Sequence, residues 1–199
     1  MVGVLAEAFV PRRVRRTVQV TLALLATAGA LVAVAALWGD VSADGGTVVL
    51  GGTLLVDGPA LVVQGTVALL GLVALLVIAD RTESGEDAFA PTASAVPGSD
   101  YENEARRRTL AQTEVFPLAL FSLGGMMLFP AAGDLLTLFV ALEVLSLPLY
   151  LLVGMARRRR LLSQEASMKY FLLGAYASAF FLFGSALLYG FAGSTRLTD

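Results

Sequence analysis

Long runs of apolar residues are the feature of this sequence that most limits how it can fold. Several runs exceed the roughly 18 residues that mark a membrane-spanning helix. The chain of 199 residues is 57% hydrophobic and only 15% charged, whereas soluble domains carry about 25% charged residues. Internal Gly and Pro residues favour membrane helices over the alternating strands of a β-barrel. The sequence therefore predicts an all-α, polytopic transmembrane helix bundle, with five spans at about 17–38, 59–79, 114–131, 134–155 and 165–191.

The composition excludes several kinds of site. The chain has no Cys and no His, which excludes thiol chemistry, haem ligation and Cys/His zinc or iron–sulfur sites on this chain. The sequence shows no Gly-rich phosphate loop. We therefore expect no cofactor and no metal on this chain, with the lipid bilayer as a partner and no nucleic acid.

The arginines alternate between the two sides of the predicted bundle. Twelve of the thirteen fall in loops on one side, at 12–16, 81, 106–108 and 157–160, and the opposite loops contain only Arg196. By the positive-inside rule the arginine-rich side is cytoplasmic. The abundance of Ala, Gly, Val and Arg beside a single Lys suggests a high-GC bacterial genome, so we expect a multi-pass protein of a bacterial plasma membrane.

The chain divides into three parts. Residues 1–79 form the N-terminal helical part, and their first ten residues, which are apolar but too short to span, look like the inner end of a longer helix. Residues 80–113 are acidic, bear Pro, Ser and Gly, and read as a flexible cytoplasmic loop, with partner docking as the alternative. Residues 114–199 form the second helical part. The stretch 39–58 is expected to be a simple connection.

Two ionisable residues lie inside predicted spans, and such groups mark functional sites because charge at membrane depth costs about 2.5–3.5 kcal/mol. Glu143 lies about 18 Å from the end of its helix at Met155, near mid-membrane. The structural alternative is a protonated carboxyl that hydrogen-bonds a neighbouring helix. Lys169, the only lysine, lies about 6 Å inside its helix, and its alternative is to snorkel to the interface.

Helical spacing places further polar groups on the faces of these two residues. Glu143 shares its face with Ser146 and Tyr150, and Lys169 shares its face with Tyr176. The two helices run antiparallel, which places Glu143 level with Tyr176 and Tyr150 level with Lys169. If the two faces meet, they form a polar string from the cytoplasm to mid-membrane, as proton relays require.

Other polar and small residues in the spans have structural interpretations. Pro148 deletes a backbone hydrogen bond and frees the carbonyl of Val144, so a kink there could admit water or a second helix. Gln64 is expected to make an interhelical hydrogen bond. Gly174 and Ser178 form a small-residue pair on the face opposite Lys169, which is typical of helix packing.

The segments "DLLTLFVALEVLSLPLYLLVG" and "SQEASMKYFLLGAYASAFFLFGSALLYG" strongly resemble subunit N of the proton-translocating NADH–quinone oxidoreductase, respiratory complex I. The specific match covers roughly residues 110–192. The resemblance implies that Glu143 is the key intramembrane glutamate and Lys169 a supporting ionisable group. It also implies an antiporter-like fold of inverted five-helix repeats, in which residues 114–199 are the first part of a proton-channel repeat and the chain is an N-terminal fragment.

The resemblance implies a function in which electrons pass through partner subunits. NADH, FMN, iron–sulfur clusters and quinone are expected on those partners, and other membrane subunits of the complex are expected beside this chain. Two alternatives remain open from the sequence. One is an antiporter-like subunit of a cation/proton antiporter complex, and the other is a truncated structural fragment without transport.

Overall fold

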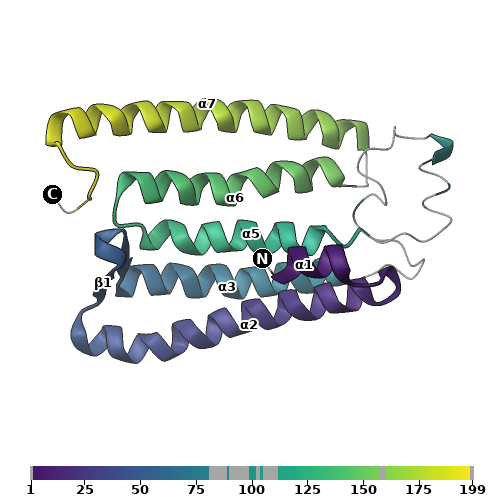
Figure 1. The fold of residues 1–199 in the computed structure, drawn as a ribbon, viewed down its shortest axis with the longest axis horizontal. Helices are drawn as coiled ribbons and strands as arrows, with labels where there is room; N and C mark the ends of the chain where they lie inside the picture. The colour runs from purple at the N-terminus through teal and green to yellow at the C-terminus, as the bar shows by residue number, and fades with distance from the viewer. Residues whose placement is uncertain are drawn as a thin grey trace.

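The structure is a computed structural model of the chain, and it describes residues 2–80, 89, 99–101, 104, 112–156 and 160–197. It confirms an all-α bundle (Figure 1). The helices are α1 (Val2–Phe9), α2 (Arg12–Asp44), α3 (Gly58–Ala79), α5 (Val115–Leu128), α6 (Leu135–Met155) and α7 (Arg160–Ala192). The predicted flexible loop 80–113 lies almost entirely outside the described residues.

Within the described residues, four helices are long and apolar enough to cross a membrane: α2, α3, α6 and α7. The predicted span at 114–131 forms the shorter helix α5, which continues into the 3-10 turn η2 (Phe129–Ala131). The helix α2 extends beyond the predicted 17–38 at both ends, because the polar residues that flank the apolar run continue the helix. The other three boundaries lie within a few residues of the predicted ones.

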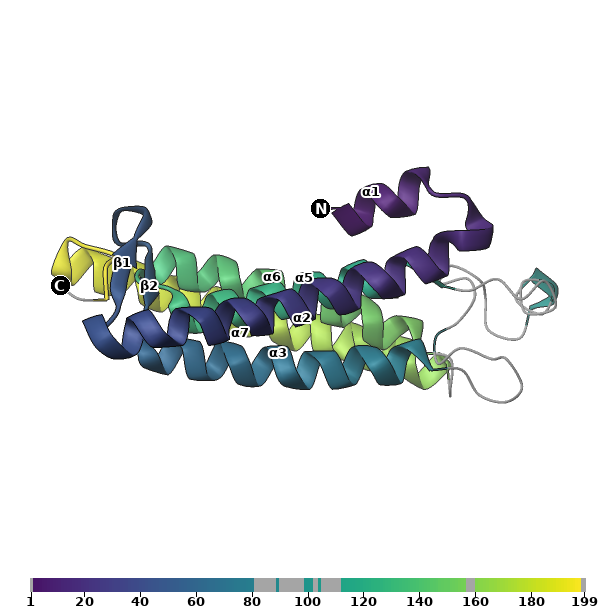
Figure 2. The same ribbon diagram turned by 90° about the horizontal axis from the view of Figure 1, so that it is seen from below.

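The helices lie side by side in the order α2, α3, α5, α6 and α7, with neighbours packed together (Figure 1). The short helix α1 folds back along the start of α2 (Figure 2). One end of the bundle, where α2 begins and α3 ends, carries Arg12, Arg13, Arg15 and Arg16. Arg16 joins the two helices there, because it donates a 2.8 Å hydrogen bond to the carbonyl of Ala79. The predicted interhelical hydrogen bond of Gln64 is confirmed, because its Nε2 donates to the carbonyl of Met127 at 2.8 Å.

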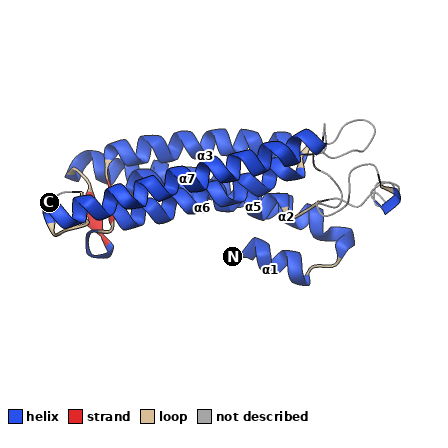
Figure 3. Cartoon of the chain, turned by 90° about the horizontal axis from the view of Figure 1, so that it is seen from above, coloured by secondary structure: helices blue, strands red, loops and turns tan. Residues whose placement is uncertain are grey.

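The opposite end of the bundle contains a small hairpin that the sequence analysis treated as a simple connection (Figure 3). Strands β1 (Thr47–Val49) and β2 (Leu54–Val56) pair antiparallel around the 3-10 turn η1 (Leu50–Gly52). The hairpin reaches the α5–α6 turn, where the N–H of Gly133 donates to the carbonyl of Thr53 at 2.7 Å. Strands of three residues are too short to show a periodic pattern, which is why the sequence did not reveal them.

Helices α5 and α6 approach each other unusually closely at Gly125. A Cβ atom added to Gly125 would overlap the backbone of Leu145 and lie 2.8 Å from its Cα. One turn away, the buried Ser122 donates a 2.8 Å hydrogen bond to the carbonyl of Leu145. Small residues at such contacts let two membrane helices bring their backbones together. The glycines of the "LGGM" stretch therefore serve helix packing at Gly125.

The neighbouring Gly124 has no atom within 4 Å of an added Cβ, so the pair provides a matched test. Gly125→Ala should lower the free energy of unfolding by about 1–3 kcal/mol, because overpacking forces the two helices apart. Gly124→Ala should be neutral or stabilising by up to about 1 kcal/mol, because alanine favours the helix. Thermal unfolding in detergent measures both variants, and equal melting temperatures would contradict the close contact.

Candidate functional site

The helix that carries Glu143 begins at a well-satisfied cap. The carboxylate of Asp134 accepts hydrogen bonds from the N–H groups of Leu136 and Thr137 and from the hydroxyl of Thr137. Burial alone raises the pKa of Asp134, but these three hydrogen bonds to the ionised form outweigh it and lower its pKa below the usual value. The cap fixes the start of α6 and so the depth at which Glu143 lies.

Glu143 is a half-buried residue near the middle of α6. Its Oε1 atom is inaccessible to solvent and has no hydrogen-bond partner among the described residues. The predicted structural alternative required a hydrogen bond from this carboxyl to a neighbouring helix, and Oε1 makes none. An inaccessible polar atom without a hydrogen bond destabilises the fold unless the carboxyl is protonated or a water molecule or another group hydrogen-bonds to it.

The α5 side of the site satisfies the backbone near Pro148. Pro148 is buried inside α6 and has no N–H to donate to the carbonyl of Val144. Ser122 of α5 donates to the adjacent carbonyl of Leu145. A serine hydroxyl from a neighbouring helix is a usual way to satisfy backbone groups loosened by a proline in a membrane helix. Ser122 thus adds a contact from α5 one residue away from the carbonyl of Val144, which Pro148 leaves without its helical donor.

The α7 side of the site is aromatic and has a clear register. The ring of Tyr150 lies 4.6 Å from that of Tyr170, and the ring of Phe139 lies 6.3 Å from that of Phe181. Eleven residues separate the two contacts on each helix, as expected for an antiparallel pair. The predicted level of Tyr150 with Lys169 is thus confirmed to within one residue. Glu143, four residues after Phe139, lies level with residue 177.

The faces of Glu143 and Lys169, whose meeting was the condition for a shared polar string, do not meet in the structure. The side chains of Lys169 and Glu165 are 69% and 57% exposed, and the two form an ion pair along α7. Tyr176, on the same face, is 68% exposed. This face of α7 points away from α6, so Lys169 and Tyr176 do not join Ser146 and Tyr150 in one string.

Side-chain size explains why α7 packs with its other face. The hydroxyl of Tyr150 occupies the space over Gly174, where an added Cβ would overlap it. The hydroxyl of Ser167 donates to the carbonyl of Tyr150 at 2.6 Å. Ser178 lies one turn beyond Gly174 and is also half-buried. The predicted packing role of Gly174 and Ser178 fits this face, and on this face Ser178 is the hydroxyl-bearing residue nearest to the level of Glu143.

A second polar cluster was missed in the sequence. Glu7 of α1 accepts hydrogen bonds from Arg15 at 3.0 Å, from Gln19 at 2.8 Å and from Thr113 at 2.7 Å. The cluster joins α1 to α2 and to the residues just before α5. Thr113 is far from Glu7 in the sequence, and no local pattern indicates such a contact.

Comparison with known proteins decides the family. Residues 132–199 match a family model described as "NADH:quinone oxidoreductase/Mrp antiporter, TM". Subunit N of the NADH-quinone oxidoreductase of Beutenbergia cavernae is 66% identical over 100% of this chain and 39% of its own length, and that of Rhodococcus opacus is 55% identical over 98% of this chain. The chain belongs to the subunit N family of NADH–quinone oxidoreductase. It spans about two fifths of the length of these relatives.

Solved structures agree with this membership. A chain of respiratory complex I from Thermus thermophilus matches with a TM-score of 0.68 and 32% identity, over 92% of this chain and 34% of that one. A chain of the archaeal membrane-bound sulfane sulfur reductase matches with the same TM-score but 18% identity, which shows a shared fold alone. This subunit N family chain therefore has the antiporter-like fold that its sequence resembled.

The cap of α6 gives a pH-dependent prediction. Because the folded-state pKa of Asp134 is lowered, its ionised form stabilises the fold above the usual pKa of aspartic acid, and that stabilisation is lost as the pH falls through the lowered pKa. Asp134→Ala should cost about 1 kcal/mol at neutral pH and less at about pH 3. Asp134→Asn keeps a capping oxygen and is the control. Thermal unfolding in detergent at the two pH values checks this, and an equal loss at both would contradict it.

The Tyr150–Gly174 contact gives a second prediction. Gly174→Ala should lower the free energy of unfolding by about 1–3 kcal/mol, because its Cβ overlaps the tyrosine hydroxyl and lies 2.7 Å from Cζ. Tyr150→Phe in the same chain should recover part of this loss. Gly184→Ala, on the same helix with nothing within 4 Å, is the matched control. Unfolding in detergent is measured for Gly174→Ala, Tyr150→Phe, the double variant and Gly184→Ala. If the double variant loses the sum of the losses of the two single variants, the contact is contradicted.

Proposed function

We propose that this chain is part of a proton-translocating membrane subunit of NADH–quinone oxidoreductase, in which Glu143 binds the transported proton. NADH oxidation and quinone reduction then take place on partner subunits, which hold the FMN and iron–sulfur clusters. The observation that carries the proposal is the buried Oε1 of Glu143, which has no hydrogen-bond partner among the described residues. A buried carboxyl that can gain or lose a proton at mid-membrane is what a proton relay requires.

The relay we propose follows the face of α6. Ser146 and Tyr150 lie three and seven residues after Glu143, so their hydroxyl groups share its face toward the arginine-rich end. The hydroxyl of Ser146 makes only a long 3.4 Å hydrogen bond to the carbonyl of Glu143, which leaves it able to reorient. In this relay Ser178 of α7 replaces Tyr176, which the sequence analysis placed level with Glu143. Pro148 supports the relay by loosening the backbone between Ser146 and Tyr150.

Lys169 and Tyr176 have a different proposed role, at a contact with other membrane subunits. An ion pair exposed to lipid within a span is unfavourable by several kcal/mol on insertion scales, about 2.5–3.5 per charge. Since Lys169 and Glu165 are both exposed on a candidate span, this face of α7 is better suited to a protein partner than to lipid. Lys169 then supports proton movement through its charge at that interface.

We further propose that the arginine-rich end is cytoplasmic in the bacterial plasma membrane. Arg12–Arg16 and Arg196 lie at opposite ends of the bundle, which agrees with the alternation seen in the sequence. A second candidate function is an antiporter-like subunit of a cation/proton antiporter complex. It is favoured by the family model over residues 132–199, whose description names both kinds of protein. Genes for redox subunits beside this one would favour the respiratory complex.

The test of the proposed function compares two substitutions in a longer subunit that contains this sequence, assembled in its complex. Glu143→Gln should reduce proton pumping by at least about tenfold, because the amide keeps shape but cannot exchange a proton. Lys169→Met should reduce it by less than about fivefold, because Lys169 does not line the proposed relay and acts on it only through its charge. The measurement is NADH-driven acidification of inverted membrane vesicles, normalised to assembled complex.

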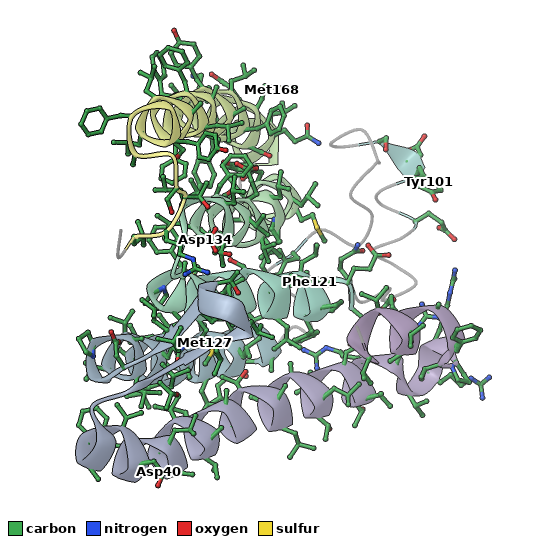
Figure 4. The ribbon with its side chains drawn as sticks, turned by 60° about the vertical axis from the view of Figure 1, so that its left-hand side comes forward. Asp40, Tyr101, Phe121, Met127, Asp134 and Met168 are labelled. Atoms are coloured by element: carbon green, nitrogen blue, oxygen red, sulfur yellow. The ribbon has the colours of Figure 1, made fainter. Side chains whose placement is uncertain are left out.

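Asp40→Asn is the control for loss of a carboxylate, since Asp40 is exposed at the far end of α2 (Figure 4). It should pump at the rate of the unmodified complex. Pumping by Glu143→Gln at that same rate would overturn the proton-binding role of Glu143. Acidification that requires sodium in place of NADH would favour the antiporter candidate.

A further inference from the structure

A groove of about 730 Å³ opens at the arginine-rich end of the bundle, between α1, α5, α6 and α7. Its walls are mostly apolar and come from all four helices. They include Val4 of α1, Leu118 and Phe121 of α5, Leu151 of α6, and Met168 and Phe171 of α7. Phe121 and Met168 are labelled in Figure 4. The volume lies within the range of small-molecule binding clefts, about 300–1,000 Å³, and such clefts combine apolar walls with a few polar groups.

The polar groups of the groove gather at its mouth. Glu7, Glu114 and Gln164 line it near the helix ends. The carboxylate of Glu7 is already matched by Arg15. Glu114 is exposed and accepts a 2.8 Å hydrogen bond from the amide of Gln112. Across residues 112–156, 160–197 and the other described parts, no cation pairs with Glu114. The mouth therefore offers a carboxylate that can accept hydrogen bonds from a ligand.

The depth of these groups matches a bilayer. Glu114 lies just before the first residue of α5, at the end of the bundle where the apolar part of this helix begins. Phe121 lies seven residues further along, about 10 Å deeper. A molecule in the groove would therefore meet an acidic group at headgroup level and apolar walls at hydrocarbon level. An amphiphile with a hydrocarbon tail and a hydrogen-bond-donating, cationic head fits this arrangement.

We propose that the groove binds a phospholipid with a primary ammonium head group, such as phosphatidylethanolamine. One acyl chain lies against Phe121 and Phe171, and the ammonium group donates hydrogen bonds to the carboxylate of Glu114. The exposed Arg12 and Arg13 at the same end of the bundle provide positive charge for the lipid phosphate. Phosphatidylglycerol lacks a cation for Glu114, and the quaternary ammonium head group of phosphatidylcholine has no N–H to donate.

Quenching of tryptophan fluorescence by brominated lipids tests this proposal on the whole chain in vesicles. The only tryptophan is Trp38, which is exposed at the other end of α2. Phe121→Trp in a Trp38→Phe background places the probe in the groove, and the unmodified Trp38 chain is the matched control. Brominated phosphatidylethanolamine, phosphatidylcholine or phosphatidylglycerol is titrated into unlabelled phosphatidylcholine vesicles. The quenching curves give the relative affinity for each lipid at each probe.

At position 121, phosphatidylethanolamine should bind about fivefold more tightly than phosphatidylcholine, since a charge-assisted hydrogen bond at an exposed site contributes modestly. At Trp38 the two lipids should quench equally. Glu114→Gln should abolish the preference at position 121, and Asp40→Asn should leave it unchanged. These results together support the proposal.

Three results would overturn it. Equal quenching by phosphatidylethanolamine and phosphatidylcholine at position 121 would show no headgroup recognition. Tighter binding of phosphatidylglycerol would show that the arginines, and not Glu114, select the lipid. A probe at position 121 that no lipid quenches would mean that protein covers the groove, either a second copy or another helix. If Phe121→Trp does not fold, native mass spectrometry of the unmodified chain with the same three lipids decides between these outcomes.

Discussion

The backbone contact between Gly125 of α5 and Leu145 of α6 sets the geometry of the site. It holds two membrane helices closer than any side chain larger than hydrogen allows at that position. Because of this approach, Ser122 reaches the carbonyl of Leu145, next to the carbonyl of Val144 that Pro148 leaves without its helical donor. The same contact keeps α6 against α5 at the level of Glu143, whose Oε1 is then shielded from solvent.

The sequence predicted the parts of this structure that depend on composition and local spacing. Apolar runs located every long helix, and the described arginines 12–16 and Arg196 lie at opposite ends of the bundle. The register between α6 and α7 followed from counting residues in an antiparallel pair, and Tyr150 meets Tyr170, one residue from the predicted level at Lys169. These features require no knowledge of which surfaces touch.

Every feature that the sequence did not reveal depends on which helix surfaces touch. Helical spacing places Lys169 and Tyr176 on one face, but it does not say which face of α7 packs. Packing favoured the side with Gly174, because the large ring of Tyr150 needs the space that glycine leaves. The Glu7 cluster and the short hairpin likewise depend on residues that are distant in sequence or strands that are short. A polar group inside a span was therefore easier to find than its neighbours.

The hairpin end of the bundle has a mechanical consequence for the helix that carries Glu143. Hydrogen bonds from Gly133 to Thr53, from Leu135 to Thr195 and from Leu197 to Gly133 converge on the two residues that flank Asp134. The start of α6 is therefore fixed by two segments, the hairpin and the C-terminal stretch, and a helix fixed at one end behaves as a lever. When α6 tilts about its first turn, each residue moves in proportion to its distance from that turn. Met155, about 30 Å away, therefore moves more than twice as far as Glu143. A molecule that binds the hairpin on one side of the membrane would thereby change the width of the groove on the other.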